Sequence, residues 1–244
     1  MISPPPGLRV AVFGAGGGIG AALVAALLAR ADVETVFALS RRPGPGQPER
    51  RLVPLAFDLQ DEASIAAAAA AIGAPLDLCV IATGVLTLPD GTGPEKSWRQ
   101  IDPAAMAQVF ALNTIGPALI ARHMLPLLPR DRRAVFAALS ARVGSIGDNR
   151  LGGWHSYRAS KAALNMLIRN FAIELARTHP QALCVALHPG TVATGLSGPF
   201  QRGVPAERLF TPGQAATHLL RVIEELTPAD SGGCFAWDGA RVAE

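Results

Sequence analysis

The chain has 244 residues, of which 50% are hydrophobic and 17% charged, and this favours one globular domain with a well-buried core. The net charge of +3 comes without a basic stripe or a recognised nucleic-acid-binding motif, which argues against binding to nucleic acid. The histidines and cysteines lack metal-ligand spacing, and the most apolar helical stretch, 19–29, is too short to cross a membrane.

Short apolar runs alternate with longer helical runs along the chain. Strands are predicted at 8–14, 34–40, 51–59, 76–84, 133–140, 183–190 and 233–239, and helices at 19–31, 62–73, 103–128, 156–178 and 212–226. The strands are continuously apolar, as is typical of strands buried on both faces of a parallel sheet. The pattern therefore predicts a single-domain α/β fold over residues 1–244, with a Rossmann-type, doubly wound parallel sheet of about seven strands.

A glycine-rich turn, "FGAGGGIG", joins the first strand to the first helix. Gly14, Gly18 and Gly20 give the spacing GxxxGxG, and Ile19 interrupts the GxGxxG form of the dinucleotide fingerprint. Glycines there allow positive φ and let a pyrophosphate approach the backbone, while the helix N-terminus offers free N–H groups. A plain tight turn is the alternative, but the position at the first strand–helix junction favours a dinucleotide.

The second strand ends in Ser40, Arg41 and Arg42. Sites that prefer NAD place an acid at this end of the strand, whereas Asp32 and Glu34 stand at its opposite end. A guanidinium suits the 2′-phosphate of NADP through forked, charge-assisted hydrogen bonds. The sequence thus predicts NADP(H) in preference to NAD(H), against the alternative of a solvated arginine pair.

Tyr157 is the only tyrosine of the chain, and Lys161 is one of two lysines. Four residues apart on a helix, their side chains share one face. A free phenol has a pKa of about 10, too high for a base at neutral pH. A cation at about 4 Å with an effective dielectric near 20 contributes about 4 kcal/mol, so Lys161 is expected to lower the pKa of Tyr157.

The order of these motifs resembles the short-chain dehydrogenase/reductase family over essentially the whole chain. It comprises the glycine turn, "ATG", "LNTIG", Ser140, YxxxK and "HPGTVAT", and the region around Tyr157 is most similar to the C-factor and sniffer-like carbonyl reductase branch. The resemblance implies that Tyr157 is the general acid/base and that Lys161 holds the nicotinamide ribose. It also implies that Asn113 anchors a water beside the lysine; a buried polar residue at a helix bend is the alternative.

The serine that orients the substrate carbonyl departs from the family pattern. The family places it three residues before the glycine that matches Gly144, and there this chain has Ala141. Ser140 lies one residue earlier, where strand alternation aims it at the opposite face unless the strand end is irregular. Ser140 is our first candidate, and Ser145, in the same loop, is the second.

Further cofactor contacts follow from the resemblance. Asp58 and Leu59 match the pair that contacts adenine, and "HPGTVAT" lies at the nicotinamide. The implied cofactor-binding residues are Gly14, Gly18, Ile19, Gly20, Ser40, Arg41, Arg42, Asp58, Leu59, Ala82, Thr83, Gly84, Asn113, Tyr157, Lys161, Pro189, Gly190, Val192 and Thr194.

The function expected from the resemblance is an NADP(H)-dependent oxidoreductase that interconverts a carbonyl and an alcohol. A non-catalytic dinucleotide-binding regulator on the same fold is the alternative. Apolar residues of the 193–211 loop, namely Leu196, Phe200, Leu209 and Phe210, favour an apolar substrate under a movable lid. A homodimer or homotetramer is expected by resemblance, and the three unpaired cysteines and the absence of a targeting signal favour the cytoplasm.

Overall fold

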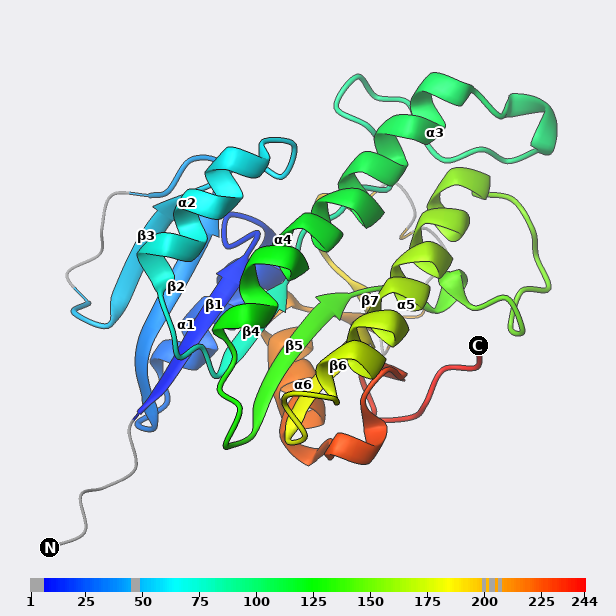
Figure 1. Cartoon of the computed structure of the whole chain (residues 1–244). Helices are drawn as coiled ribbons and strands as arrows, with labels where there is room; N and C mark the ends of the chain where they lie inside the picture. The colour runs from blue at the N-terminus through cyan, green and yellow to red at the C-terminus, as the bar shows by residue number, and fades with distance from the viewer. Residues whose placement is uncertain (1–6, 45–48, 199–200, 202–204, 206–207) are drawn as a thin grey trace, which may run out of the picture.

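A seven-stranded parallel sheet forms the centre of the computed structural model, which describes residues 7–44, 49–198, 201, 205 and 208–244 (Figure 1). Its spatial order is β3-β2-β1-β4-β5-β6-β9, and the pairs are all parallel. The strands are β1 (Leu8–Phe13), β2 (Val33–Ser40), β3 (Leu52–Ala56), β4 (Leu78–Ile81), β5 (Ala134–Leu139), β6 (Ala182–His188) and β9 (Cys234–Ala236). The order reverses between β1 and β4, and this switch point is where such sheets bind ligands. The predicted doubly wound sheet is confirmed.

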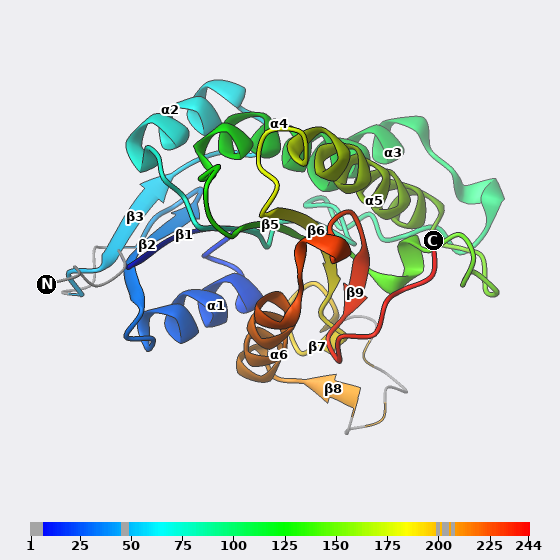
Figure 2. The ribbon, with the colours of Figure 1, turned by 60° about the horizontal axis from the view of Figure 1, so that its bottom comes forward.

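Helices cover both faces of the sheet (Figure 2). α1 (Gly18–Leu28) and α6 (Pro212–Glu225) pack together on one face, and α2 (Glu62–Ile72), α4 (Gly116–Met124) and α5 (His155–Leu175) lie on the other. Each face has its own apolar core, because alternate residues of the central strands point to opposite sides. Cys79, Cys184 and Cys234 are free and buried, as predicted for reduced thiols.

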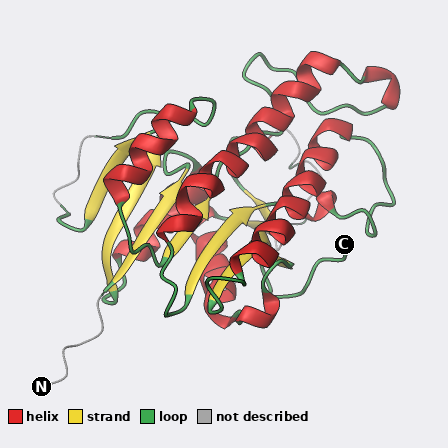
Figure 3. Ribbon diagram, in the orientation of Figure 1, coloured by secondary structure: helices red, strands yellow, loops and turns green. Residues whose placement is uncertain are grey.

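The long helix predicted over 103–128 is divided. α3 (Pro103–Phe110) passes through a π-helical turn at Ala111–Ile115 into α4, as the continuous ribbon in Figure 3 shows. The stretch Pro103–Leu127 is long and apolar enough to cross a membrane by length and composition. Its α4 part buries Ile120, Ala121 and Met124 in the core, which is the pattern of a core helix.

Two short strands follow β6 and were not predicted. β7 (Thr191–Val192) pairs in parallel with β8 (Leu209–Phe210), which ties the start of the 193–211 loop to its end. Phe210 packs edge-on against Trp237 with ring centroids 4.7 Å apart. Leu209 and Phe210 are therefore half-buried anchors of the loop, Leu196 is 41% exposed, and Phe200 lies outside the described residues.

Candidate active site

The glycine turn after β1 has no room for side chains. Gly14 has a φ of +88°, and a Cβ there would lie 2.9 Å from the carbonyl carbon of Ala82 at the end of β4. A Cβ on Gly20 would lie 2.1 Å from the carbonyl oxygen of Gly14. The turn thus fits tightly between β4 and the first turn of α1, and the glycines predicted there are sterically required.

The start of α1 faces two other predicted segments. The N-cap residue Gly17 makes no side-chain cap, which leaves the N–H groups at this end of the helix without a cap from the N-cap residue. A Cβ on Gly18 would lie 2.8 Å from Cγ2 of Thr194, in the loop after β7. A Cβ on Gly16 would lie 3.6 Å from Cβ of Ser40 at the end of β2. Three predicted cofactor segments therefore meet at this helix end.

Gly84, in the loop after β4, is the meeting point of three further motifs. With a φ of +150°, its missing Cβ would lie 3.1 Å from Oδ1 of Asn113 and 3.4 Å from Nζ of Lys161. Asn113, in the π-helical turn, accepts a hydrogen bond from the backbone N–H of Val85 at 2.8 Å and donates one to its carbonyl at 2.8 Å. The side chain of Asn113 thus fixes the loop after β4 beside Lys161.

Tyr157 and Lys161 lie on one face of α5 and are 8% and 4% exposed. Nζ of Lys161 donates to the carbonyl of Leu139 at 2.8 Å and lies 5.9 Å from the centroid of the Tyr157 ring. Burial raises the pKa of Tyr157 to about 12 and lowers the pKa of Lys161 to about 8. The expected lowering of the phenol pKa is thus wrong for the protein without cofactor, because desolvation outweighs a lysine directed at a carbonyl.

One cavity of about 260 Å³ contains both side chains. Its wall is formed by the ends of α1, β4, β5 and β6 and the first turns of α5. The predicted site residues that line it are Ile19, Ala82, Thr83, Gly84, Ser140, Tyr157, Lys161, Pro189, Gly190, Val192 and Thr194.

Ser140 lines this cavity, but its hydroxyl points toward α5. Its Oγ donates to Oδ1 of Asn165 at 2.7 Å, and the pairing of β5 with β6 is regular, so no bulge re-aims the side chain. A substrate-orienting role therefore requires Oγ to leave Asn165. Ser145, the second candidate, lines a separate cavity, and its Oγ accepts from the N–H of Asp148 at 3.0 Å, so the structure does not bring it to the cavity of Tyr157.

The residues predicted for the adenosine end lie apart from this cavity. Arg41 and Arg42 are exposed directly after β2, and neither guanidinium pairs with a carboxylate in the described part of the chain. The Asp58 carboxylate accepts from the N–H of Gln60 at 2.9 Å. The Leu59 side chain is in the core against Gly116, which leaves its backbone as the part able to contact a ligand.

Two polar groups of the cavity wall are buried without a hydrogen-bond partner among the described residues. They are Oγ1 of Thr83, among the predicted cofactor residues, and Nδ1 of His188, which the sequence analysis did not include in the site. Burial and the neighbouring Arg142 lower the pKa of His188 to about 4, so the ring is neutral at physiological pH. The sequence could have indicated this residue, because His188 stands at the carboxyl end of a predicted strand, where ligand-binding residues lie in such sheets.

The family of the chain follows from its sequence as well as from this geometry. The model of the short chain dehydrogenase family matches residues 9–204. The chain is a short-chain dehydrogenase/reductase. Its family and relatives make it an oxidoreductase, and the resemblance stated from the motifs is confirmed.

Relatives of this short-chain dehydrogenase/reductase include enzymes and a protein named for signalling. It is 37% identical to the 1-hydroxy-2-glutathionyl-2-methyl-3-butene dehydrogenase of Rhodococcus sp. (strain AD45), over 75% of this chain and 76% of that protein. It is 35% identical to the C-signal protein of Myxococcus xanthus, over 69% and 92%. Among solved structures, NADPH-bound carbonyl reductase from chicken fatty liver has a TM-score of 0.81 at 31% identity, with 98% and 99% of the chains covered.

Proposed function

We propose that this enzyme is an NADP(H)-dependent carbonyl reductase, which reduces a carbonyl compound to an alcohol and also catalyses the reverse oxidation. Tyr157 is its general acid/base. The observation that carries the proposal is the convergence of Tyr157, Lys161 and Gly84 in one cavity that continues from the glycine turn. The fold alone would not support an activity, because one fold hosts many functions.

The cavity suits a dinucleotide in shape and chemistry. The glycine turn leaves Gly16, Gly17 and Gly18 exposed at the N-terminus of α1, where phosphates would lie. Oγ1 of Thr83, which has no hydrogen-bond partner within the described residues, is available to a ribose or amide group. Bound nicotinamide would supply or accept the hydride at the substrate carbon. Tyr157 would donate its phenolic proton to the carbonyl oxygen, and it would take the proton back in alcohol oxidation.

The preference for NADP(H) rests on the end of β2. Arg41 and Arg42 supply positive charge that no carboxylate of the described residues neutralises. The neighbouring solved structures include one with NADPH bound and one from Burkholderia multivorans with NADP bound, at 26% identity and a TM-score of 0.80. A 2′-phosphate fits this site better than a bare ribose hydroxyl.

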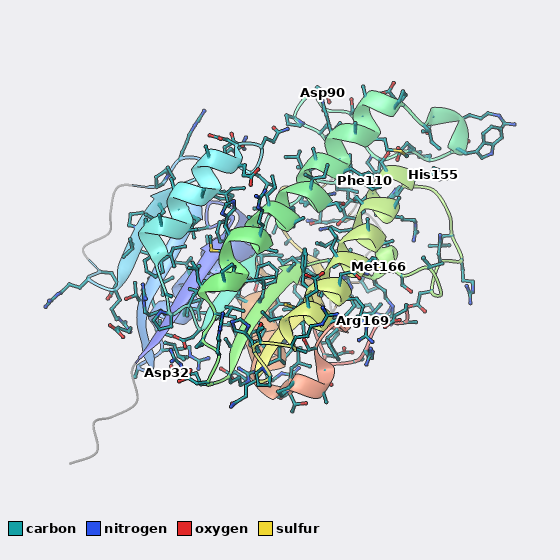
Figure 4. All side chains as sticks on the ribbon, viewed as in Figure 1. Asp32, Asp90, Phe110, His155, Met166 and Arg169 are labelled. Carbon is teal, nitrogen blue, oxygen red and sulfur yellow. The ribbon has the colours of Figure 1, made fainter. Side chains whose placement is uncertain are left out.

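The substrate we infer is an apolar carbonyl compound. Leu86, Leu139, Val143 and Leu196 line the cavity around Tyr157, and an apolar group of the substrate would be buried against them. A cytoplasmic location and a homo-oligomer stay predictions, as do the expected lack of nucleic-acid and membrane partners. Met166 and Ile173 on α5 are exposed, and they would form an apolar contact surface in such an oligomer (Met166 in Figure 4).

The test is oxidation of NADPH by the purified protein with a panel of aldehydes, ketones and quinones. Turnover with at least one carbonyl, and its loss in Tyr157→Phe with NADPH binding retained, is the expected result. The similarity to the C-signal protein favours a second candidate, a dinucleotide-binding regulator. NADPH binding with no turnover across the panel would favour that candidate instead.

A further inference from the structure

The catalytic helix begins without a cap of its own. Tyr157 is the third residue of α5, in the turn whose N–H groups have no partner within the helix. Trp154, at the N-cap position, makes no side-chain cap, and the first turn of α5 contains no acid. The position of Tyr157 therefore depends on what else holds this helix end.

Glu95, sixty residues earlier in the chain, contacts these groups. Its carboxylate accepts from the N–H of Ser156 at 3.1 Å through Oε2 and at 3.3 Å through Oε1, and the hydroxyl of Ser156 also donates to it. The side chain is 9% exposed and lines a cavity that Tyr157 also lines. A carboxylate at a helix N-terminus also interacts favourably with the helix dipole.

The backbone of Glu95 holds the turn that leads into α5. Gly152, Gly153 and Trp154 have consecutive φ values of +63°, +64° and +51°, and a bulky residue rarely adopts such values. The N–H of Trp154 donates to the carbonyl of Glu95 at 2.5 Å. The Trp154 ring then meets the Tyr157 ring edge-on, with centroids 6.3 Å apart.

The loop that contains Glu95 is tied to the site at its other end too. It starts at Gly84 and Val85, which Asn113 fixes beside Lys161. At one end of the molecule, the start of α5 lies near both this loop and α3. Figure 4 labels His155 at the start of α5 and Asp90 in the loop. One loop thus joins the Lys161 end of the site to the Tyr157 end.

We propose that Glu95 is a positioning residue, which caps α5 from the loop after β4 and thereby fixes Tyr157 and Trp154 relative to Lys161. This inference rests on the proposed function of Tyr157. It predicts that loss of the carboxylate moves the phenol without disturbing the distant dinucleotide segments.

The experiment compares Glu95→Ala and Glu95→Gln with a matched control, Asp61→Ala. Asp61 caps α2 through the N–H of Ala63 at 3.0 Å, so the control also loses a helix cap, but on a helix other than the one that contains Tyr157. Steady-state kinetics with NADPH and the best carbonyl of the panel give kcat and KM. We expect kcat to fall about tenfold to a hundredfold in Glu95→Ala and less in Glu95→Gln, as small misplacements of a reacting group cost this much. The dissociation constant of NADPH should change less than about twofold, which is the scatter expected between independent, distant sites.

The sole tyrosine supplies a readout that does not need activity. In protein labelled with 13Cζ-tyrosine, one resonance reports Tyr157. It should shift or broaden in Glu95→Ala and Glu95→Gln and stay unchanged in Asp61→Ala, and the amide of Ser156 should lose hydrogen-exchange protection in the two Glu95 variants. An unchanged Tyr157 resonance in a folded Glu95→Gln protein, or equal kcat values for Glu95→Ala and Asp61→Ala, would overturn the proposal. If the unmodified enzyme turns over no carbonyl, the proposed function fails, while the resonance and the exchange data still decide whether Glu95 positions Tyr157.

Discussion

At the scale of single residues, the environment of Tyr157 separates the two directions of the proposed reaction. With a pKa raised to about 12 by burial, the phenol keeps its proton at neutral pH and is ready to donate it to a carbonyl oxygen. Alcohol oxidation needs the phenolate, which the buried site disfavours without a second cation. Lys161, with a pKa lowered to about 8, is still mostly charged at pH 7 but is directed at the carbonyl of Leu139.

Ultraviolet titration of the sole tyrosine tests this environment. The folded protein without cofactor should show little phenolate absorbance below pH 11, because burial raises the pKa of Tyr157 to about 12. Saturating NADP+ should lower the apparent pKa, since the nicotinamide adds a cation near the phenol. Tyr157→Phe should abolish the signal. A titration near pH 10 in the folded, cofactor-free protein would contradict the buried phenol.

The proposed preference for NADP(H) also rests on single residues. Replacing Arg41 and Arg42 together by alanine should weaken NADPH binding at least about tenfold more than NADH binding, because two charge-assisted contacts to a 2′-phosphate are lost. Fluorescence titration with each cofactor measures the ratio. Arg30→Ala is the control, since Arg30 pairs with Asp32 at the opposite end of β2. Equal losses for both cofactors would assign the 2′-phosphate to other residues.

At the scale of elements, the turn that divides the long helix contains a predicted site residue and is followed by a tight packing contact. The π-helical turn at Ala111–Ile115 contains Asn113, which reaches the loop after β4. π-turns inside helices often occur at functional sites, because the extra residue re-aims side chains. α4 then starts at Gly116, where a Cβ would lie 2.3 Å from Cγ of Leu59. The loop after β3 thus packs directly against the start of α4.

The contact of Leu59 with Gly116 predicts a specific coupling. Gly116→Ala should lower the free energy of unfolding by about 1–3 kcal/mol through overpacking. In a Leu59→Ala background the same change should cost much less, because the clashing side chain is gone. Urea unfolding of the two single variants and the double variant measures the coupling. Gly213→Ala in α6 is the control, as nothing lies within 4 Å of a Cβ there, and additive effects of the two changes would contradict the packing.

At the scale of the whole molecule, burial of polar groups at the carboxyl edge of the sheet makes stability depend on pH. His188 at the end of β6 has a pKa lowered to about 4, against 6.5 for an ordinary histidine. Between these values the unfolded chain binds more protons at this position than the folded protein does. Stability is therefore lost as the pH falls from about 6.5 toward 4.

Thermal unfolding as a function of pH tests this contribution. His188→Asn should flatten the decline of Tm between pH 6.5 and 4 relative to the unmodified protein, because asparagine does not titrate. Carboxylates contribute to the decline in both proteins, so the difference in slope is the quantity to measure. Parallel curves over this range would show that His188 does not stay neutral in the folded state.

Sequence patterns alone determined the architecture and most of the cavity. Continuous apolar strands such as 133–140, set between helical periods, specify a parallel sheet, because only strands covered on both faces can be apolar throughout. The glycines at 14, 18 and 20 and the pair Tyr157 and Lys161 were identifiable because turns and helical spacing are local properties of the chain.

Only the tertiary structure decided what surrounds these groups. The phenol pKa depends on burial by segments distant in sequence, so an i,i+4 spacing could not show that desolvation exceeds the effect of Lys161. The hydroxyl of Ser140 donates a hydrogen bond to Asn165, the carboxylate of Glu95 reaches α5, and Nδ1 of His188 has no partner in the described part of the chain. Each of these depends on contacts between residues far apart along the chain, and such contacts exist only once the sheet has brought its strand ends to one edge.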